Sequence, residues 1–194
     1  MAGYIRSLAD VEEFCRGRLA TAGAVNASFA AAAHALWSQR AGAERWELLD
    51  AECSARLPSV ALRSASRALG SGLRRLLRSM SPEAEVDAAW ALIERPAPHH
   101  GIVLGAAVAI ADGDAVLAAQ AAALASITAP ASAAVRLLGL DPLATAAMLA
   151  RLAPLVADCQ PTPSSPDLLP AFSAPALDLL AEVHRNAEVR LFAS

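Results

Sequence analysis

The chain has 194 residues and a formal net charge of −3, and it is 56% hydrophobic but only 4% aromatic. All 16 basic residues are arginine, so the sequence excludes a P-loop NTPase and an internal lysine Schiff base, which both need a lysine. The small negative net charge gives no strong electrostatic attraction to nucleic acid or to an anionic membrane. Alanine and leucine dominate the apolar residues and favour helices, so we expect an all-α protein. The predicted architecture is one domain over residues 1–194, a bundle of roughly eight to ten helices.

The first half of the chain predicts five helices. Ser7 and Asp10 have the spacing of a capping box, which predicts a helix that begins at Leu8. Apolar residues at helical spacing then predict helices over residues 26–37, 44–56 and 60–80, with a break at Leu57-Pro58. Ser81-Pro82-Glu83 is a helix start signal, and the helix that follows is predicted to end near Glu94.

The second half predicts apolar helices separated by short breaks. After a loop at residues 96–98, His99-His100 precede two apolar helices, which divide near Asp112-Gly113-Asp114. Pro130 is expected to open another helix or to kink this one. Gly139 is expected to end this helix, and Asp141-Pro142 to start the next one, which ends near Asp158. Residues 160–170 are predicted to form a proline-rich loop. Ser173 is then expected to be the N-cap of a last helix.

The uncharged stretch Ala115–Val135 raises the question of a membrane span. It is mostly alanine and contains Gln120 and Pro130, whereas spanning helices are usually richer in larger apolar residues. We therefore expect a buried core helix and no membrane association. No secretory signal is visible at the start of the sequence. The cysteines Cys15, Cys53 and Cys159 are far apart in the sequence, which favours reduced thiols over disulfides. We therefore expect a cytoplasmic protein.

His99-His100 is the most conspicuous candidate for a metal site. Neighbouring residues on a helix point about 100° apart, and no further ligand follows at a spacing of three or four residues. A structural or helix-capping role is therefore favoured, and we predict no metal ligand, catalytic residue or directly bound cofactor. An enzyme that uses His99, His100 or a cysteine stays as an alternative, because catalytic partners can be distant in sequence.

The segment 63–80 combines an arginine stripe with two glycines. Gly70 and Gly72 each cost about 1 kcal/mol relative to alanine within a helix, and close approach of another helix is the simplest explanation. The arginines Arg63, Arg67, Arg74, Arg75 and Arg78 lie opposite leucines. Two readings are open: a solvated amphipathic helix or a face that binds a partner.

Four ordered segments resemble those of the urease accessory protein UreF family. The first comprises Arg63, Ser66, Arg67, Gly70, Gly72, Leu73, Arg75 and Leu76, and resembles the central helix of the family. The second is Pro98-His99 followed by Leu104-Gly105, and the third is Ala133–Leu138 followed by Leu140-Asp141-Pro142. The fourth is the C-terminal set His184, Arg190, Leu191, Phe192 and Ser194, which is similar to the family's ending.

The sequence also departs from this pattern at both ends. The family's usual N-terminal segment, which contains His-Ser-x-Gly-Leu-Glu, has no counterpart, so we expect that about one helix is missing and that the chain is poorly soluble alone. A glutamate and a glutamine usual in the family's C-terminal segment are also absent, and Arg185, Asn186 and Ala187 stand in that stretch.

The resemblance implies a non-catalytic scaffold for urease maturation. It would join the partner UreD (also called UreH) and recruit the GTPase UreG for nickel insertion into the urease apoprotein, with nickel and GTP on those partners, and relatives suggest a homodimer. The expected partner-binding residues are His184, Arg190, Leu191, Phe192 and Ser194, with Arg63, Arg67, Gly70, Gly72 and Arg75. The tail, residues 185–194, would order on a partner, or else fold back on its own domain. The alternative function is a helical ligand-binding or regulatory module without catalytic activity.

Overall fold

A computed structural model describes residues 5–80, 98–160 and 165–186, and within these ranges every regular element is a helix. The elements are α1 (Leu8–Arg18), the π-helical turn η1 (Leu19–Gly23), α2 (Ala24–Ser38), α3 (Ala43–Ala55), α4 (Val60–Met80), α6 (His100–Ile110), α7 (Ala115–Leu138), α8 (Pro142–Ala157), the 3-10 turn η2 (Pro166–Leu168) and α9 (Pro175–Arg185). The all-α prediction is confirmed. With Leu8–Ser38 counted as one continuous helix, these ranges hold seven α-helices, slightly fewer than the predicted eight to ten. The helix predicted over residues 82–94 lies outside the described residues.

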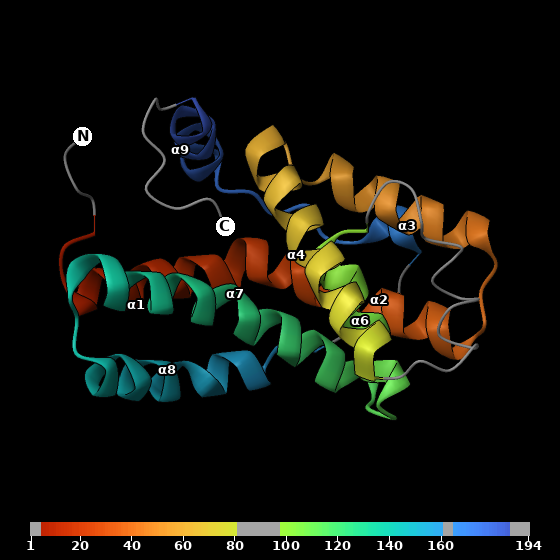
Figure 1. Ribbon diagram of the computed structural model, residues 1–194, viewed down its shortest axis with the longest axis horizontal. Coiled ribbons are helices and arrows are strands. Elements are labelled where there is room, and N and C mark those ends of the chain that lie inside the picture. Colours follow the sequence, from red (N-terminus) through yellow and green to blue (C-terminus); the bar gives the residue numbers. More distant parts are fainter. Residues whose placement is uncertain (1–4, 81–97, 161–164, 187–194) are drawn as a thin grey trace.

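Helix α2 is the centre of the arrangement, and it packs against α3, α6 and α7 (Figure 1). Helix α8 lies along α7 on one side of the molecule, while α3, α4 and α9 lie on the opposite side. The N-terminal part of α6 sits between α2 and α4, so it joins the central helix to the outer one.

Small residues let these helices come close together. A Cβ added at Gly105 of α6 would lie 2.0 Å from the carbonyl oxygen of Ala30 on α2, so the two backbones touch there. Larger side chains fill the two ends of the core. One cluster centres on Phe29, Leu49 and Ile102, and the other joins α1, α7 and α8 through Cys15, Ile127, Met148 and Leu152.

Most helix ends follow the sequence signals. The Ser7 hydroxyl accepts from the Asp10 N–H at 3.2 Å and the Asp10 carboxylate accepts from the Ser7 N–H at 2.9 Å, so the predicted capping box is confirmed. Gly139 ends α7 with a φ of 65°, and Asp141 caps α8. The prediction for Ser173 is wrong: α9 begins at Pro175, and its N-cap Ala174 has no side chain that can accept a hydrogen bond.

Helices are continuous at two places where the sequence allows a break. The stretch between the first two predicted helices is bridged by η1, which joins α1 to α2 without a turn. Pro130 opens no new helix, and α7 runs through it. Proline has no N–H, so the Ser126 carbonyl four residues earlier loses its usual donor. The Arg18 Nε takes that place and donates to the Ser126 oxygen at 3.0 Å.

Leu8–Ser38 and Ala115–Leu138 are long and apolar enough to cross a membrane, judged by length and composition alone. This is weak evidence, because core helices of soluble proteins satisfy the same criterion. Here α7 buries one face, including Ala119, Ala123 and Ile127, against its neighbours, and 33% of its most apolar stretch is buried.

Candidate functional site: the face of α4 and α9

Helix α9 is fastened to the N-terminus of α4 by one carboxylate. The Glu182 Oε1 accepts from the Ser59 hydroxyl at 2.6 Å and from the Ala61 N–H at 2.8 Å. The first turn of a helix has N–H groups without partners inside the helix, so a carboxylate is favoured there. These two hydrogen bonds, the Ser59 bond first, lower the pKa of Glu182 to about 2, and Arg185 adds a salt bridge at 2.9 Å.

Helix α9 also exposes apolar side chains. No residue of α9 is fully buried, while Leu179 is 69% exposed and Val183 is 55% exposed. These two side chains are four residues apart and therefore lie on one stripe of the helix. His184 follows on the exposed surface, next to the start of the predicted tail.

Helices α4 and α6 meet at a glycine. A Cβ added at Gly70 would lie 2.1 Å from the Pro98 carbonyl oxygen and 3.2 Å from the His100 nitrogen. The close approach predicted for this glycine is therefore confirmed: the start of α6 rests on the α4 backbone. Gly72 has no described atom within 4 Å of such a Cβ, so the described residues give no packing reason for this second glycine.

A partly buried ion pair joins α3 to α4 beside this contact. The Arg67 guanidinium donates to the Asp50 carboxylate at 2.6 Å and to the Ser54 hydroxyl at 2.8 Å. Asp50 is also the acceptor for the His99 N–H, at 3.2 Å. One carboxylate thus holds both α4 and the residue that precedes α6.

His99 is the centre of this polar network. It is fully buried, and its ring nitrogens make hydrogen bonds with Ser54 at 2.9 Å and with Ser66 at 3.1 Å. Burial, with a further contribution from the nearby Arg67 charge, lowers the pKa of His99 to about 4, so the ring is neutral at pH 7. Both nitrogens are occupied and solvent does not reach the ring, so the network joins helices and offers no open site for a substrate. This agrees with the structural role predicted for His99, which occupies the N-cap position of α6.

Within the ranges that the structure describes, no three His, Cys, Asp or Glu side chains gather as metal ligands would. The face of α4 and α9 thus has two distinct parts. One is the hydrogen-bonded junction of α3, α4 and α6, and the other is the exposed apolar stripe of α9.

Comparison with known proteins identifies the family. The family model UreF matches residues 5–153, which covers α1 to most of α8. The chain belongs to the UreF family. Proteins named urease accessory protein UreF match along the whole chain: one from Mycobacterium sp. (strain JLS) is 38% identical and one from Mycobacterium marinum is 37% identical, and the chain covers 85% of each. A third, from Mycobacterium tuberculosis (strain ATCC 25618 / H37Rv), is 36% identical over 203 aligned positions, which cover all of this chain and 85% of the relative.

The UreF motif on α4 is divided between inward and outward positions. Gly70 and Arg67 face neighbouring helices, and Arg63 donates to the carbonyl oxygens of Leu57 and Pro58 at the start of α4. Arg75 is exposed. The contacts that Arg63, Arg67 and Gly70 make within the chain explain these residue types without any partner. Their role in partner binding stays a prediction.

The C-terminal part of the UreF resemblance is described only as far as Asn186. His184 lies on the exposed side of α9, whereas Arg190, Leu191, Phe192 and Ser194 lie outside the described residues. Whether the tail binds a partner or folds back is therefore still a prediction.

Two important residues of this UreF-family face were not predicted. Asp50 has a signal in the sequence, because it interrupts the apolar spacing of Trp46, Leu49 and Cys53 with an acid on a buried face. Glu182 has none, since nothing local to α9 shows that its carboxylate caps another helix 121 residues earlier in the chain.

Proposed function

We propose that the chain is a non-catalytic scaffold in urease maturation, which binds UreD/UreH and recruits the GTPase UreG to deliver nickel to the urease apoprotein. In this proposal the nucleotide and nickel chemistry belongs to the partners, and the complex forms in the cytoplasm. Membership of the UreF family supports the general role. The observation that carries the protein-binding role is the apolar stripe of α9.

This stripe is hard to explain by the folding of the chain alone. Glu182 holds one side of α9 on α4, while Leu179 and Val183 on another side contact solvent. Burying such side chains against a partner contributes about 25 cal/mol per Å² of apolar area. The stripe also leads directly toward residues 187–194, which contain the predicted tail residues Arg190, Leu191 and Phe192. We therefore place the UreD/UreH contact on α9 and the tail together.

The exposed part of α4 offers a second surface for a partner. Arg75 and Leu76 are adjacent in sequence and both exposed, and Leu76 is 54% exposed. Arginine is enriched at protein interfaces relative to the rest of the surface. We assign this surface to UreG or to a second copy of the chain.

Co-purification with UreD/UreH and UreG from the same genome tests the proposal. The full chain is compared with a chain ending at Asn186, which keeps Glu182, and with the double variant Leu179→Ala and Val183→Ala. Leu143→Ala on α8 is the matched control, because Leu143 is 80% exposed on the opposite side of the molecule. We expect the full chain and the control to retain UreD/UreH, and both altered chains to lose it.

The outcomes separate the parts of the proposal. Retention by all four chains would remove the contact from α9 and the tail, and would direct attention to an Arg75→Ala variant. Failure of the full chain to retain any partner would overturn the scaffold proposal. Light scattering of the purified chain and of the complex gives the oligomeric state and tests the expected homodimer.

A further inference from the structure

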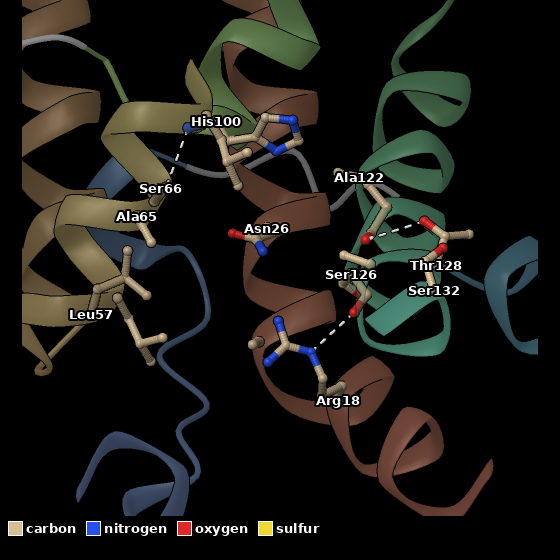
Figure 2. A pocket seen from close by; sticks show the side chains of 15 residues that line it. Arg18, Asn26, Leu57, Ala65, Ser66, His100, Ala122, Ser126, Thr128 and Ser132 are labelled. Atoms are coloured by element: carbon tan, nitrogen blue, oxygen red, sulfur yellow. Dashed lines mark hydrogen bonds between the residues drawn. The ribbon is translucent and has the colours of Figure 1, made fainter. Parts of the chain in front are cut away.

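A cavity of about 440 Å³ lies between α4 and the layer formed by α1, α2 and α7, with His100 of α6 at one end (Figure 2). Its size falls at the lower end of the range for small-molecule sites. The walls are mainly apolar, from Leu57, Leu62 and Leu69 on one side and alanines of α7 on the other. The partner-binding surfaces proposed above do not use this cavity.

Arg18 supplies a positive charge to the cavity. Its Nε is fixed by the Ser126 carbonyl oxygen that Pro130 leaves free, and its guanidinium carbon lies 5.9 Å from the centre of the Phe14 ring. No carboxylate pairs with Arg18 among the described residues. In Figure 2 its two terminal nitrogens point away from Ser126 into the space beside Asn26. Burial lowers the pKa of Arg18, but an arginine side chain stays charged in a protein.

Two further polar groups border the same space without a hydrogen-bond partner in the described part of the chain. They are the Asn26 carboxamide from α2 and the His100 imidazole from α6, and both side chains are partly buried. The His100 backbone is fixed, because its N–H donates to the Ser66 hydroxyl at 3.2 Å. Three helices thus bring hydrogen-bonding groups to one cavity, where the Asn26 and His100 side chains are available to a ligand.

A second, smaller cavity of about 50 Å³ shares the Arg18, Asn26 and Leu62 walls and continues toward α9. Phe172 and Leu177 line it, together with Asp178, which is the acidic residue of this lining. The guanidinium of Arg18 thus stands at the wall that the two cavities share, beside the leucine side chains Leu57 and Leu62. This arrangement suits a ligand that has one anionic end and an unbranched apolar chain.

We propose that this cavity binds an alkyl carboxylate. The carboxylate accepts two hydrogen bonds from the terminal nitrogens of Arg18 and one from Asn26, and the alkyl chain lies along Leu57, Leu62 and Leu69. A guanidinium fork matches the two oxygens of a carboxylate, whereas a neutral alcohol offers it only one acceptor. This inference concerns a small-molecule site and does not depend on the scaffold function.

Calorimetric titration of the full chain with sodium octanoate tests the proposal, with 1-octanol as the neutral ligand of equal chain length. We expect saturable binding of octanoate and at least tenfold weaker binding of octanol, since hydrogen bonds to a charged group contribute substantially. Arg18→Gln should weaken octanoate binding by at least tenfold. The matched control is Arg16→Gln, which makes the same charge change on α1 at an exposed arginine that pairs with Glu12.

Arg18→Gln also removes the bond to Ser126, so a second variant protects the test from a folding defect. Ala65→Leu enlarges a side chain that lines the cavity on α4 and keeps Arg18 in place. We expect it to weaken octanoate binding by at least tenfold while thermal unfolding stays cooperative. Absence of saturable binding at millimolar octanoate, equal binding of octanol, or unchanged binding by Ala65→Leu would each overturn the proposal. An unchanged partner co-purification in these variants would confirm that the two sites are separate.

Discussion

Replacing the two glycines of α4 by alanine should change stability in opposite directions. Gly70 and Gly72 are two residues apart in one helix, so they share the same backbone environment and the same intrinsic gain from alanine, about 1 kcal/mol. They differ in what a new Cβ would meet. At Gly70 it would lie 2.1 Å from the Pro98 carbonyl oxygen, whereas at Gly72 no described atom lies within 4 Å.

The geometry sets the size of the two effects. The atom that obstructs a Cβ at Gly70 belongs to the backbone, so α4 and the start of α6 must separate, and such overpacking costs about 3 kcal/mol at the upper end of its usual range. After subtraction of the helix-propensity gain, Gly70→Ala should lower the free energy of unfolding by about 2 kcal/mol. Gly72→Ala should raise it by about 0.5–1 kcal/mol.

Urea and thermal unfolding of both variants, followed by circular dichroism, measure this difference. For a chain of this size, 1 kcal/mol corresponds to a change in Tm of roughly 2–4 °C, so Gly70→Ala should melt about 4–8 °C lower. Equal effects of the two substitutions, or a more stable Gly70→Ala variant, would refute the packing argument and leave helix propensity as the dominant influence.

Three further predictions concern ionisable groups. His99 has a folded-state pKa of about 4, below the ordinary 6.5, so its stabilising contribution is complete above about pH 6.5 and is lost as the pH falls toward 4. His99→Gln should flatten that part of the stability profile, and an unchanged slope would contradict this assignment. Glu182, with a pKa of about 2, keeps α9 in place above about pH 4.5 and releases it as the pH falls toward 2. Glu182→Gln should therefore speed limited proteolysis of α9 at pH 7, and equal protection would argue against the contact. Cys15 and Cys53 are buried, and burial raises the pKa of Cys53 to about 12. A thiol reagent should therefore modify Cys159 first, which peptide mass spectrometry would show. Earlier labelling of Cys53 would be inconsistent with the packing of α3.

Local signals predicted the helices well because they act within a few residues. The expected helix over residues 60–80 matches α4, and the expected start at Asp141-Pro142 matches α8. The failures come from longer-range effects. Pro130 predicts a new helix or a kink, and the structure has no new helix there; Arg18, more than 100 residues earlier, donates to the carbonyl that the proline leaves free.

The candidate site was only partly predictable for the same reason. A glycine inside a helix is a local anomaly, so close packing at Gly70 could be expected, although the partner segment could not. The pairing of Asp50 with Arg67 depends on how α3 and α4 cross, which no local pattern specifies. The sequence marks Asp50 as an acid within an apolar face and Arg67 as part of the arginine stripe, and it gives no sign that the two residues pair.

The π-helical turn at Leu19–Gly23 has a consequence for how this protein can vary in length. One residue added to an α-helix rotates everything beyond it by about 100°, unless a wider turn absorbs the addition. In this chain η1 is such a turn, and it stands between α1, which packs on α7 and α8, and α2, which packs on α3 and α6. Loss of a single residue inside η1 could be accommodated by tightening the turn to α-helical geometry, with both flanking faces kept in register. The same loss a few residues later, within α2, would turn Phe29 and Leu36 away from their neighbours. The loss of one residue is thus easier to accommodate at η1 than within α2, and η1 adjoins Arg18.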